Sequence, residues 1–198
     1  YGSLIGGRKF NLALDPGAPT VAVLPGSRRA EVARLGDPFA ATLAWLHERR
    51  PEIRFVAPMA NEAVRELFKH SLAQHAPGVP IALVDGRAQE ALAAADAVLV
   101  ASGTATLETA LIKRPMVVAY RVAPLTAWLM RSMKLMKAEF FAQPNLLAGR
   151  QVVPEYLQED VRPDVLGPAL LAQLQRPDHA ELIATFTAIH STLRRDAS

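Results

Sequence analysis

Short apolar runs alternate with longer amphipathic stretches over the first 120 residues of the chain. Short runs of mainly apolar residues, separated by turn-forming residues, are typical of β-strands. The runs that predict strands are residues 20–24, 53–57, 81–84, 97–101 and 116–119. Because the fourth run contains no polar residue, we expect it to be a central strand that is buried on both faces.

The stretches between these runs have the spacing of amphipathic helices. Asp37 can cap a helix that continues to Arg50, and Asn61 can cap a second helix that continues to Gln74. Two shorter helices are expected over residues 89–95 and 104–112. The alternation of strands and helices predicts a Rossmann-like α/β fold, a parallel sheet with helices on both faces.

The alternation ends after Tyr120. Residues 140–150 contain Pro144 and Gly149, and we expect this segment to be irregular. Proline near the start of a stretch favours a helix. The helices expected in this carboxyl-terminal part are residues 125–136, 163–175 and 177–195.

The composition narrows the classes of function. The chain contains no cysteine, which excludes disulfides, thiolate nucleophiles and zinc–cysteine sites within it. None of its five histidines falls in a metal-binding pattern, so we expect no metal. No apolar run is long enough to span a membrane, and residues 1–10 lack the apolar core of a signal peptide. A cytoplasmic location is therefore the expectation.

The net charge of +3 suits an anionic ligand or an anionic membrane surface. Nucleic acid is not expected, because aromatic residues make up 6% of the chain and do not alternate with basic ones. Residues 128–137 alternate Trp, Leu and Met with Arg and Lys. This stretch could contact a lipid surface, although a methionine stripe more often packs against a core.

Ligands of open parallel sheets bind at the carboxyl ends of the strands, so the loops there are the candidate sites. In the loop after the first strand, Gly26 allows close approach of a ligand, Ser27 offers a hydroxyl and Arg28 a forked cation that suits phosphate. The alternative is a plain strand-to-helix turn with solvated arginines, and the loop alone slightly favours that interpretation.

The loop after the fourth strand, Ser102-Gly103-Thr104, enters a helix whose free amides and dipole can bind an anion. Glu108 lies one turn further on and could accept hydrogen bonds from ribose hydroxyls. The alternative is an ordinary helix cap followed by a surface glutamate. The fully apolar strand that leads into the loop favours a functional site. The loop matches neither a P-loop nor a dinucleotide fingerprint, so no such cofactor is expected.

Two further segments are open to two interpretations. The loop Asp85-Gly86-Arg87 could border a base with its backbone, or it could be a simple turn. Gln143 and Asn145 lie in a long polar connection that could carry function, or they could satisfy the backbone groups of a buried linker.

Four motifs resemble the carboxyl-terminal domain of lipid-A-disaccharide synthases, in the same order and at similar spacing. They are LPGSR at 24–28, ASGTATLE at 101–108, PMVVAYR at 115–121 and PNLLAGR at 144–150. Their joint occurrence makes the resemblance specific. It implies that residues 18–198 form the UDP-sugar donor-binding domain of a GT-B glycosyltransferase, with carboxyl-terminal helices. Residues 1–17 are a head segment that the resemblance does not match.

The resemblance implies a reaction and its partners. The donor is UDP-2,3-diacylglucosamine, the acceptor is 2,3-diacylglucosamine 1-phosphate (lipid X), and the products are lipid A disaccharide 1-phosphate and UDP. It further implies a cytoplasmic protein that acts at the inner membrane, without a cofactor or metal, and whose chains exchange segments within a homodimer.

The resemblance also assigns roles to the candidate residues. The diphosphate would be cradled by Ser102, Gly103 and Thr104, beside Gly26 and Ser27. Glu108 would bind the ribose, and Gly86 and Arg87 would border the uracil. The residues assigned to catalysis are Arg28, which would neutralise the leaving phosphate, and Gln143 and Asn145 nearby, which could serve the site of a neighbouring subunit.

A full synthase of this kind has a second domain that binds the acceptor and supplies the catalytic base. We therefore expect this chain to bind the donor without turning it over. Two alternatives remain open: another UDP-sugar enzyme of the same fold, such as a relative of the peptidoglycan glycosyltransferase or of UDP-GlcNAc 2-epimerase, or a non-catalytic nucleotide-binding or membrane-surface module.

Overall fold

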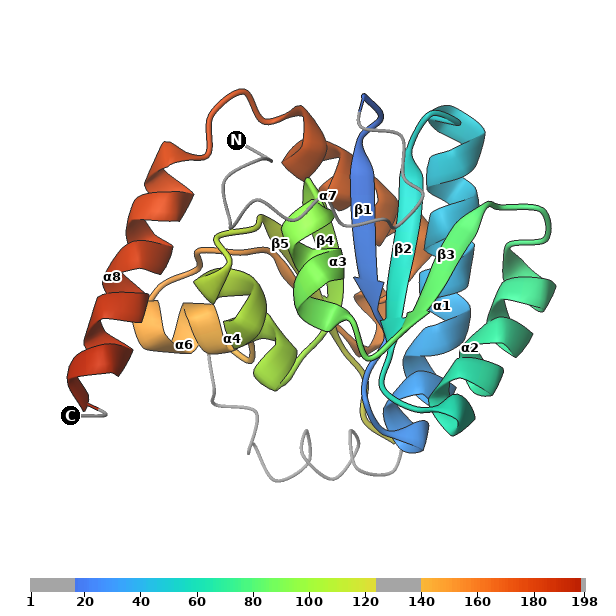
Figure 1. Ribbon diagram of the computed structural model, residues 1–198, viewed down its shortest axis with the longest axis horizontal. Coiled ribbons are helices and arrows are strands. Elements are labelled where there is room, and N and C mark those ends of the chain that lie inside the picture. The colour runs from blue at the N-terminus through green and yellow to red at the C-terminus, as the bar shows by residue number, and fades with distance from the viewer. Residues whose placement is uncertain (1–16, 124–139, 197–198) are drawn as a thin grey trace.

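The computed structural model describes residues 17–123 and 140–196. Its centre is a six-stranded parallel sheet with the strand order β3-β2-β1-β4-β5-β6 (Figure 1). The strands are β1 (Thr20–Leu24), β2 (Arg54–Met59), β3 (Ile81–Asp85), β4 (Ala97–Ala101), β5 (Met116–Tyr120) and β6 (Glu155–Leu157). The Rossmann-like prediction is confirmed, and each of the five predicted strands is present.

Helices cover both faces of the sheet. One apolar core joins the sheet to α1 (Arg29–Arg49), α2 (Glu62–His75) and α7 (Pro163–Gln175). The other joins it to α3 (Ala88–Ala94), α4 (Thr104–Leu111), α6 (Gln143–Ala148) and α8 (Ala180–Asp196). A short 3₁₀ helix, η1 (Gln158–Asp160), follows β6. Strand β1 alternates between the cores, with Val21 and Val23 in the first and Ala22 and Leu24 in the second.

The predicted start of the first long helix at Asp37 is wrong. Helix α1 begins at Arg29, and Asp37 lies inside it, where its carboxylate accepts a hydrogen bond from the Ser71 hydroxyl at 2.7 Å. Pro38 follows within the helix and has no N–H for the carbonyl of Arg34 four residues earlier. The Arg121 guanidinium lies 3.5 Å from that carbonyl and compensates in part for the missing bond.

The prediction that residues 140–150 are irregular is also wrong, because α6 lies within them. Pro144 sits in the first turn, where a missing N–H leaves no helical bond unmade. Gly149 ends the helix with a φ of 64°, the left-handed conformation that glycine adopts readily. The two residues that suggested irregular chain thus mark the two ends of a short helix.

The remaining predicted helices agree with the structure within a few residues. Asn61 caps α2 as expected, since its Oδ1 accepts the Val64 N–H at 3.0 Å. The helix predicted over residues 125–136, with its methionine and basic positions, lies outside the described residues. In the part of the chain that is described, the structure contains no helix with the length and apolar character needed to cross a membrane.

Candidate nucleotide site

The loops after β1 and β4 follow neighbouring strands and lead the chain toward opposite edges of the sheet. Strands β1 and β4 pair in parallel, with Leu24 opposite Val100 near their carboxyl ends. From β1 the chain crosses through α1 to β2 on one side, and from β4 it crosses through α4 to β5 on the other (Figure 1). In open parallel sheets, such a reversal of strand order is the usual place at which a ligand binds. The structure therefore places the predicted loops after the first and fourth strands on neighbouring strands.

The loop after β1 is held in place by Glu31 in the first turn of α1. Its Oε2 accepts hydrogen bonds from the backbone N–H groups of Ser27 at 3.0 Å and Arg28 at 3.3 Å. Gly26 has a φ of 126°, and a Cβ atom at this position would lie 2.6 Å from the Cβ of Glu31. Glycine is thus required here both by the backbone conformation and by the close approach of Glu31.

Replacing Gly26 by alanine should lower the free energy of unfolding by about 1–3 kcal/mol, through strain and the contact with Glu31. Gly78 is the matched control, because it also has a positive φ, of 81°, but a Cβ there would meet nothing within 4 Å. Urea denaturation of Gly26→Ala and Gly78→Ala measures the difference. Equal losses in the two variants would show that the contact with Glu31 contributes nothing.

Arg28 is free to turn toward a ligand. Its side chain is 83% exposed, and its Nη1 lies 3.6 Å from Oε1 of Glu31. An exposed ion pair at this distance contributes little to stability. The guanidinium can therefore exchange Glu31 for a stronger anion without a large penalty.

The loop after β4 presents open backbone at the start of α4. Gly103 is the N-cap residue, with a φ of 151°, and a Cβ there would meet nothing within 4 Å. No side chain of the described residues caps α4, and Gly103, Thr104 and Glu108 are all exposed. The first amides of a helix lack intrahelical partners, so they are available to an anion here.

Ser102 is engaged within the protein. Its hydroxyl donates a hydrogen bond to the carbonyl of Phe141 at 3.0 Å, and its N–H donates to the carbonyl of Ala119 at 2.9 Å. The first of these contacts joins the β4 loop to the segment that leads into α6, so the start of α6 lies next to the β4 loop.

Gln143 and Asn145 have different surroundings although both lie in α6. Asn145 is fully buried, and its Oδ1 accepts the backbone N–H groups of Val152 at 2.7 Å and Val153 at 2.9 Å. Its Nδ2 donates to the carbonyl of Val153 at 2.9 Å. The side-chain oxygen of Gln143, in contrast, is shielded from solvent and has no hydrogen-bond partner among residues 17–123 and 140–196.

The loop after β3 lies to one side, because β2 separates β3 from β1. Gly86 has a φ of 63° and donates its N–H to the carbonyl of Met59 at 3.0 Å. Arg87 is paired with Glu90, with its Nε 2.7 Å from Oε2. The charge of Arg87 is therefore balanced within α3.

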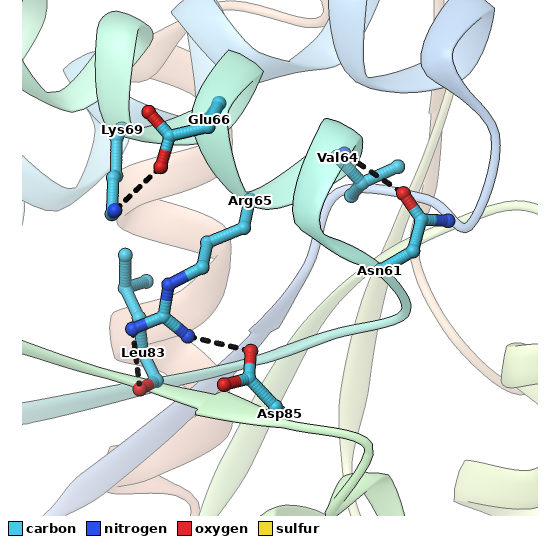
Figure 2. A network of polar contacts seen from close by, with 7 residues as sticks. All are labelled: Asn61, Val64, Arg65, Glu66, Lys69, Leu83 and Asp85. Carbon is cyan, nitrogen blue, oxygen red and sulfur yellow. Dashed lines mark hydrogen bonds and ion pairs between the residues drawn. The ribbon is translucent and has the colours of Figure 1, made fainter.

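A neighbouring ion pair fixes the end of β3. Figure 2 shows Arg65, from α2, reaching Asp85 with an Nη1 to Oδ1 distance of 2.6 Å, while its Nη2 lies 3.5 Å from the carbonyl of Leu83. Arg65 is the more buried partner, with 21% of its side chain exposed against 72% for Asp85. The contact holds α2 to the strand just before the Gly86 turn.

Comparison with known proteins gives the chain its family. Residues 5–192 match the model of the lipid-A-disaccharide synthetase family. The chain belongs to this family. A lipid-A-disaccharide synthase of Hahella chejuensis is 47% identical over 190 residues, which cover 96% of this chain and 48% of that protein. The synthase of Alkalilimnicola ehrlichii is 52% identical over 189 residues, covering 95% of this chain and 49% of that protein.

This lipid-A-disaccharide synthase homologue thus spans about half the length of the curated relatives that it matches. The match begins within the predicted head segment, whose residues 1–16 lie outside the described part of the structure. The division into a head at 1–17 and a domain at 18–198 stays a prediction.

Solved structures of other proteins share the fold of this chain at low sequence identity. UDP-GlcNAc 2-epimerase from Neisseria meningitidis, bound to UDP-GlcNAc, has a TM-score of 0.56 and 14% identity over 92% of this chain and 46% of its own. A mutant of S. aureus TarM, in complex with Fondaparinux, alpha-GlcNAc-glycerol and UDP, has a TM-score of 0.59 and 8% identity over 98% of this chain and 35% of its own. These likenesses confirm the glycosyltransferase-type fold.

The sequence analysis missed the roles of two carboxylates in this synthase homologue. Glu31 stands three residues after the N-cap Arg28, which is the spacing of a capping box, so its contact could have been predicted. Glu155, in β6, accepts hydrogen bonds from the backbone N–H groups of residues 141 and 142. These residues are distant from Glu155 in the sequence, so no local pattern predicts the contact.

Proposed function

We propose that this chain is the donor-binding half of a lipid-A-disaccharide synthase. The complete enzyme transfers 2,3-diacylglucosamine from its UDP derivative to lipid X and releases lipid A disaccharide 1-phosphate and UDP. The observation that carries the proposal is the meeting of the β1 and β4 loops at the reversal of strand order, in a chain of this family. The UDP-sugar ligand of a protein with the same fold supports it.

The diphosphate binds between these two loops. The free amides of Gly103 and Thr104 and the dipole of α4 meet its negative charge, beside Gly26 and Ser27. Arg28 reaches in from the β1 loop. As the glycosidic bond breaks, charge grows on the departing diphosphate, and Arg28 and the amides stabilise it. This stabilisation is electrostatic: the fold holds the amides in place, and Arg28 turns toward the growing charge.

The nucleoside extends from the diphosphate. Glu108 lies one turn along α4 from Thr104 and is exposed, so its carboxylate accepts hydrogen bonds from the ribose hydroxyls. The uracil lies toward the β3 loop, bordered by Gly86 and Arg87. Since Arg87 is neutralised by Glu90, its contribution is backbone and apolar contact and not charge.

The two predicted residues of α6 serve different purposes. The side-chain oxygen of Gln143 is shielded from solvent and has no hydrogen-bond partner in the described part of the chain, so we assign it to a hydrogen bond with a donor group of the bound ligand. Asn145 uses both atoms of its amide to hold the chain at residues 152 and 153. We therefore assign Asn145 a positioning role, in which it acts through α6.

The rest of the synthase supplies what this chain does not. The acceptor site and the catalytic base lie in the half of the relatives that this chain does not cover. The lipid acceptor places the enzyme at the cytoplasmic surface of the inner membrane, as a peripheral protein. A second copy of the chain completes a homodimer.

The release of UDP by the complete synthase tests the reaction. We expect UDP to appear with UDP-2,3-diacylglucosamine only when lipid X is added, with the disaccharide 1-phosphate as the second product. UDP-GlcNAc without an acceptor is the control. Epimerised UDP-GlcNAc would identify a UDP-sugar enzyme of another kind, and binding without any product would indicate a nucleotide-binding module.

A further inference from the structure

Glu155, the first residue of β6, reaches the backbone in front of α6. Its Oε2 accepts hydrogen bonds from the N–H groups of Phe141 at 3.0 Å and Ala142 at 2.6 Å, and its Oε1 lies 3.2 Å from the nitrogen of Phe141. Ala142 is the N-cap residue of α6 and is fully buried. A carboxylate that accepts from backbone N–H groups makes strong, charge-assisted hydrogen bonds. Glu155 therefore fixes the point at which α6 begins.

Phe141 is also contacted by residues at the carboxyl ends of β4 and β5, the two strands that precede β6 in the order of the sheet. The Ser102 hydroxyl, after β4, donates to its carbonyl at 3.0 Å. Its ring stacks on Tyr120, the last residue of β5, with ring centroids 5.9 Å apart and an angle of 19° between the planes. Three residues, in or directly after β4, β5 and β6, thus contact Phe141. Removing one contact leaves the other two, so the segment should loosen without leaving its place.

These contacts connect two parts of the proposed donor site. Ser102 belongs to the loop whose amides meet the diphosphate, and Gln143 directly follows the N-cap residue Ala142. We propose that Glu155 is a positioning residue of the donor site, which holds the β4 loop and Gln143 in register by clamping residues 141 and 142. This inference rests on the proposed function, since it assigns Glu155 an effect on nucleotide affinity.

The contacts of Glu155 with residues 141 and 142 can be removed without unfolding the chain. The far end of α6 is held independently, by Asn145 and by the Gly149 cap. Strand β6 pairs with β5 through its backbone, from Val118 opposite Glu155 to Tyr120 opposite Leu157. Loss of the Glu155 carboxylate should therefore free the amides of residues 141 and 142 while the sheet stays intact.

Calorimetric titration with UDP tests the inference, with hydrogen exchange on the same proteins. We expect Glu155→Ala to weaken UDP binding about fivefold, the equivalent of one lost hydrogen bond, and Glu155→Gln to weaken it less because one acceptor oxygen remains. The N–H groups of residues 141 and 142 should exchange faster in both variants, while those of β4 keep their protection. The control is Glu48→Gln, since Glu48 is 73% exposed in the last turn of α1.

The outcomes separate the inference from the proposed function. Normal UDP affinity in Glu155→Ala would overturn the inference alone, as would faster exchange throughout the sheet, which would mean a purely structural role. If Glu155→Ala does not fold, Glu155→Gln decides, and unchanged affinity there would overturn the inference. A wild-type chain that binds no UDP would overturn the proposed function and the inference with it.

Discussion

Replacing Arg28 by alanine in the complete synthase should lower kcat at least tenfold. The side chain of Arg28 is 83% exposed in the β1 loop, and its ion pair with Glu31, at 3.6 Å, is weak. A charge-assisted hydrogen bond to the leaving diphosphate is worth about 1.5–3 kcal/mol, which corresponds to a factor of ten or more in rate. The loss should fall on kcat more than on KM, because the charge that Arg28 meets grows in the transition state.

Arg29 supplies the matched control for this prediction. It is the next residue, it is also exposed, and Arg29→Ala removes the same charge from the first turn of α1. Arg28→Lys keeps the charge but loses the forked geometry and should fall between the two alanine variants. Steady-state kinetics with saturating lipid X gives the comparison. Equal turnover in Arg28→Ala and wild type would remove Arg28 from the reaction.

Replacing Asn145 by alanine should destabilise the chain by at least about 2 kcal/mol, because it leaves buried backbone groups without partners. The side chain is fully buried and makes three hydrogen bonds, to the N–H groups of Val152 and Val153 and to the carbonyl of Val153. Alanine can replace none of them. Asn145→Asp keeps the acceptor but sets a carboxylate against a carbonyl, so it too should destabilise.

Urea denaturation measures this effect, with Gln151→Ala as the control. Gln151 is another side-chain amide in the same connection, but it is exposed. A positioning role for Asn145 predicts that stability falls together with UDP affinity. An Asn145→Ala chain as stable as the wild type, with reduced turnover in the complete enzyme, would instead assign Asn145 to direct contact with the substrate.

The parts of the site that the sequence predicted depend on local signals. Apolar runs predict strands, and in a parallel sheet the loops after them share one edge, so Arg28 and Thr104 could be placed near each other before the structure was known. The register of Leu24 opposite Val100 confirms that both loops leave the same end of neighbouring strands. The nucleotide-binding roles themselves stay predictions.

The elements that the sequence reasoning missed depend on contacts between distant residues. Strand β6 is three residues long and only partly buried, so its pattern is too short to identify, and β5 determines its pairing. Asp37 precedes an apolar stretch, as an N-cap residue does, but its carboxylate accepts a hydrogen bond from the Ser71 hydroxyl on α2. Glu31, six residues earlier, is the carboxylate that serves the start of α1.

The most direct test of the donor site is calorimetric titration of this chain with UDP, for the wild type and for Glu108→Ala. We expect the wild type to bind and the variant to bind about tenfold more weakly, because a carboxylate that accepts ribose hydroxyls is lost. Glu48→Ala, an exposed glutamate on α1, should bind as the wild type does. A folded wild-type chain that binds no UDP, or a Glu108→Ala chain with wild-type affinity, would contradict the site proposed at the start of α4.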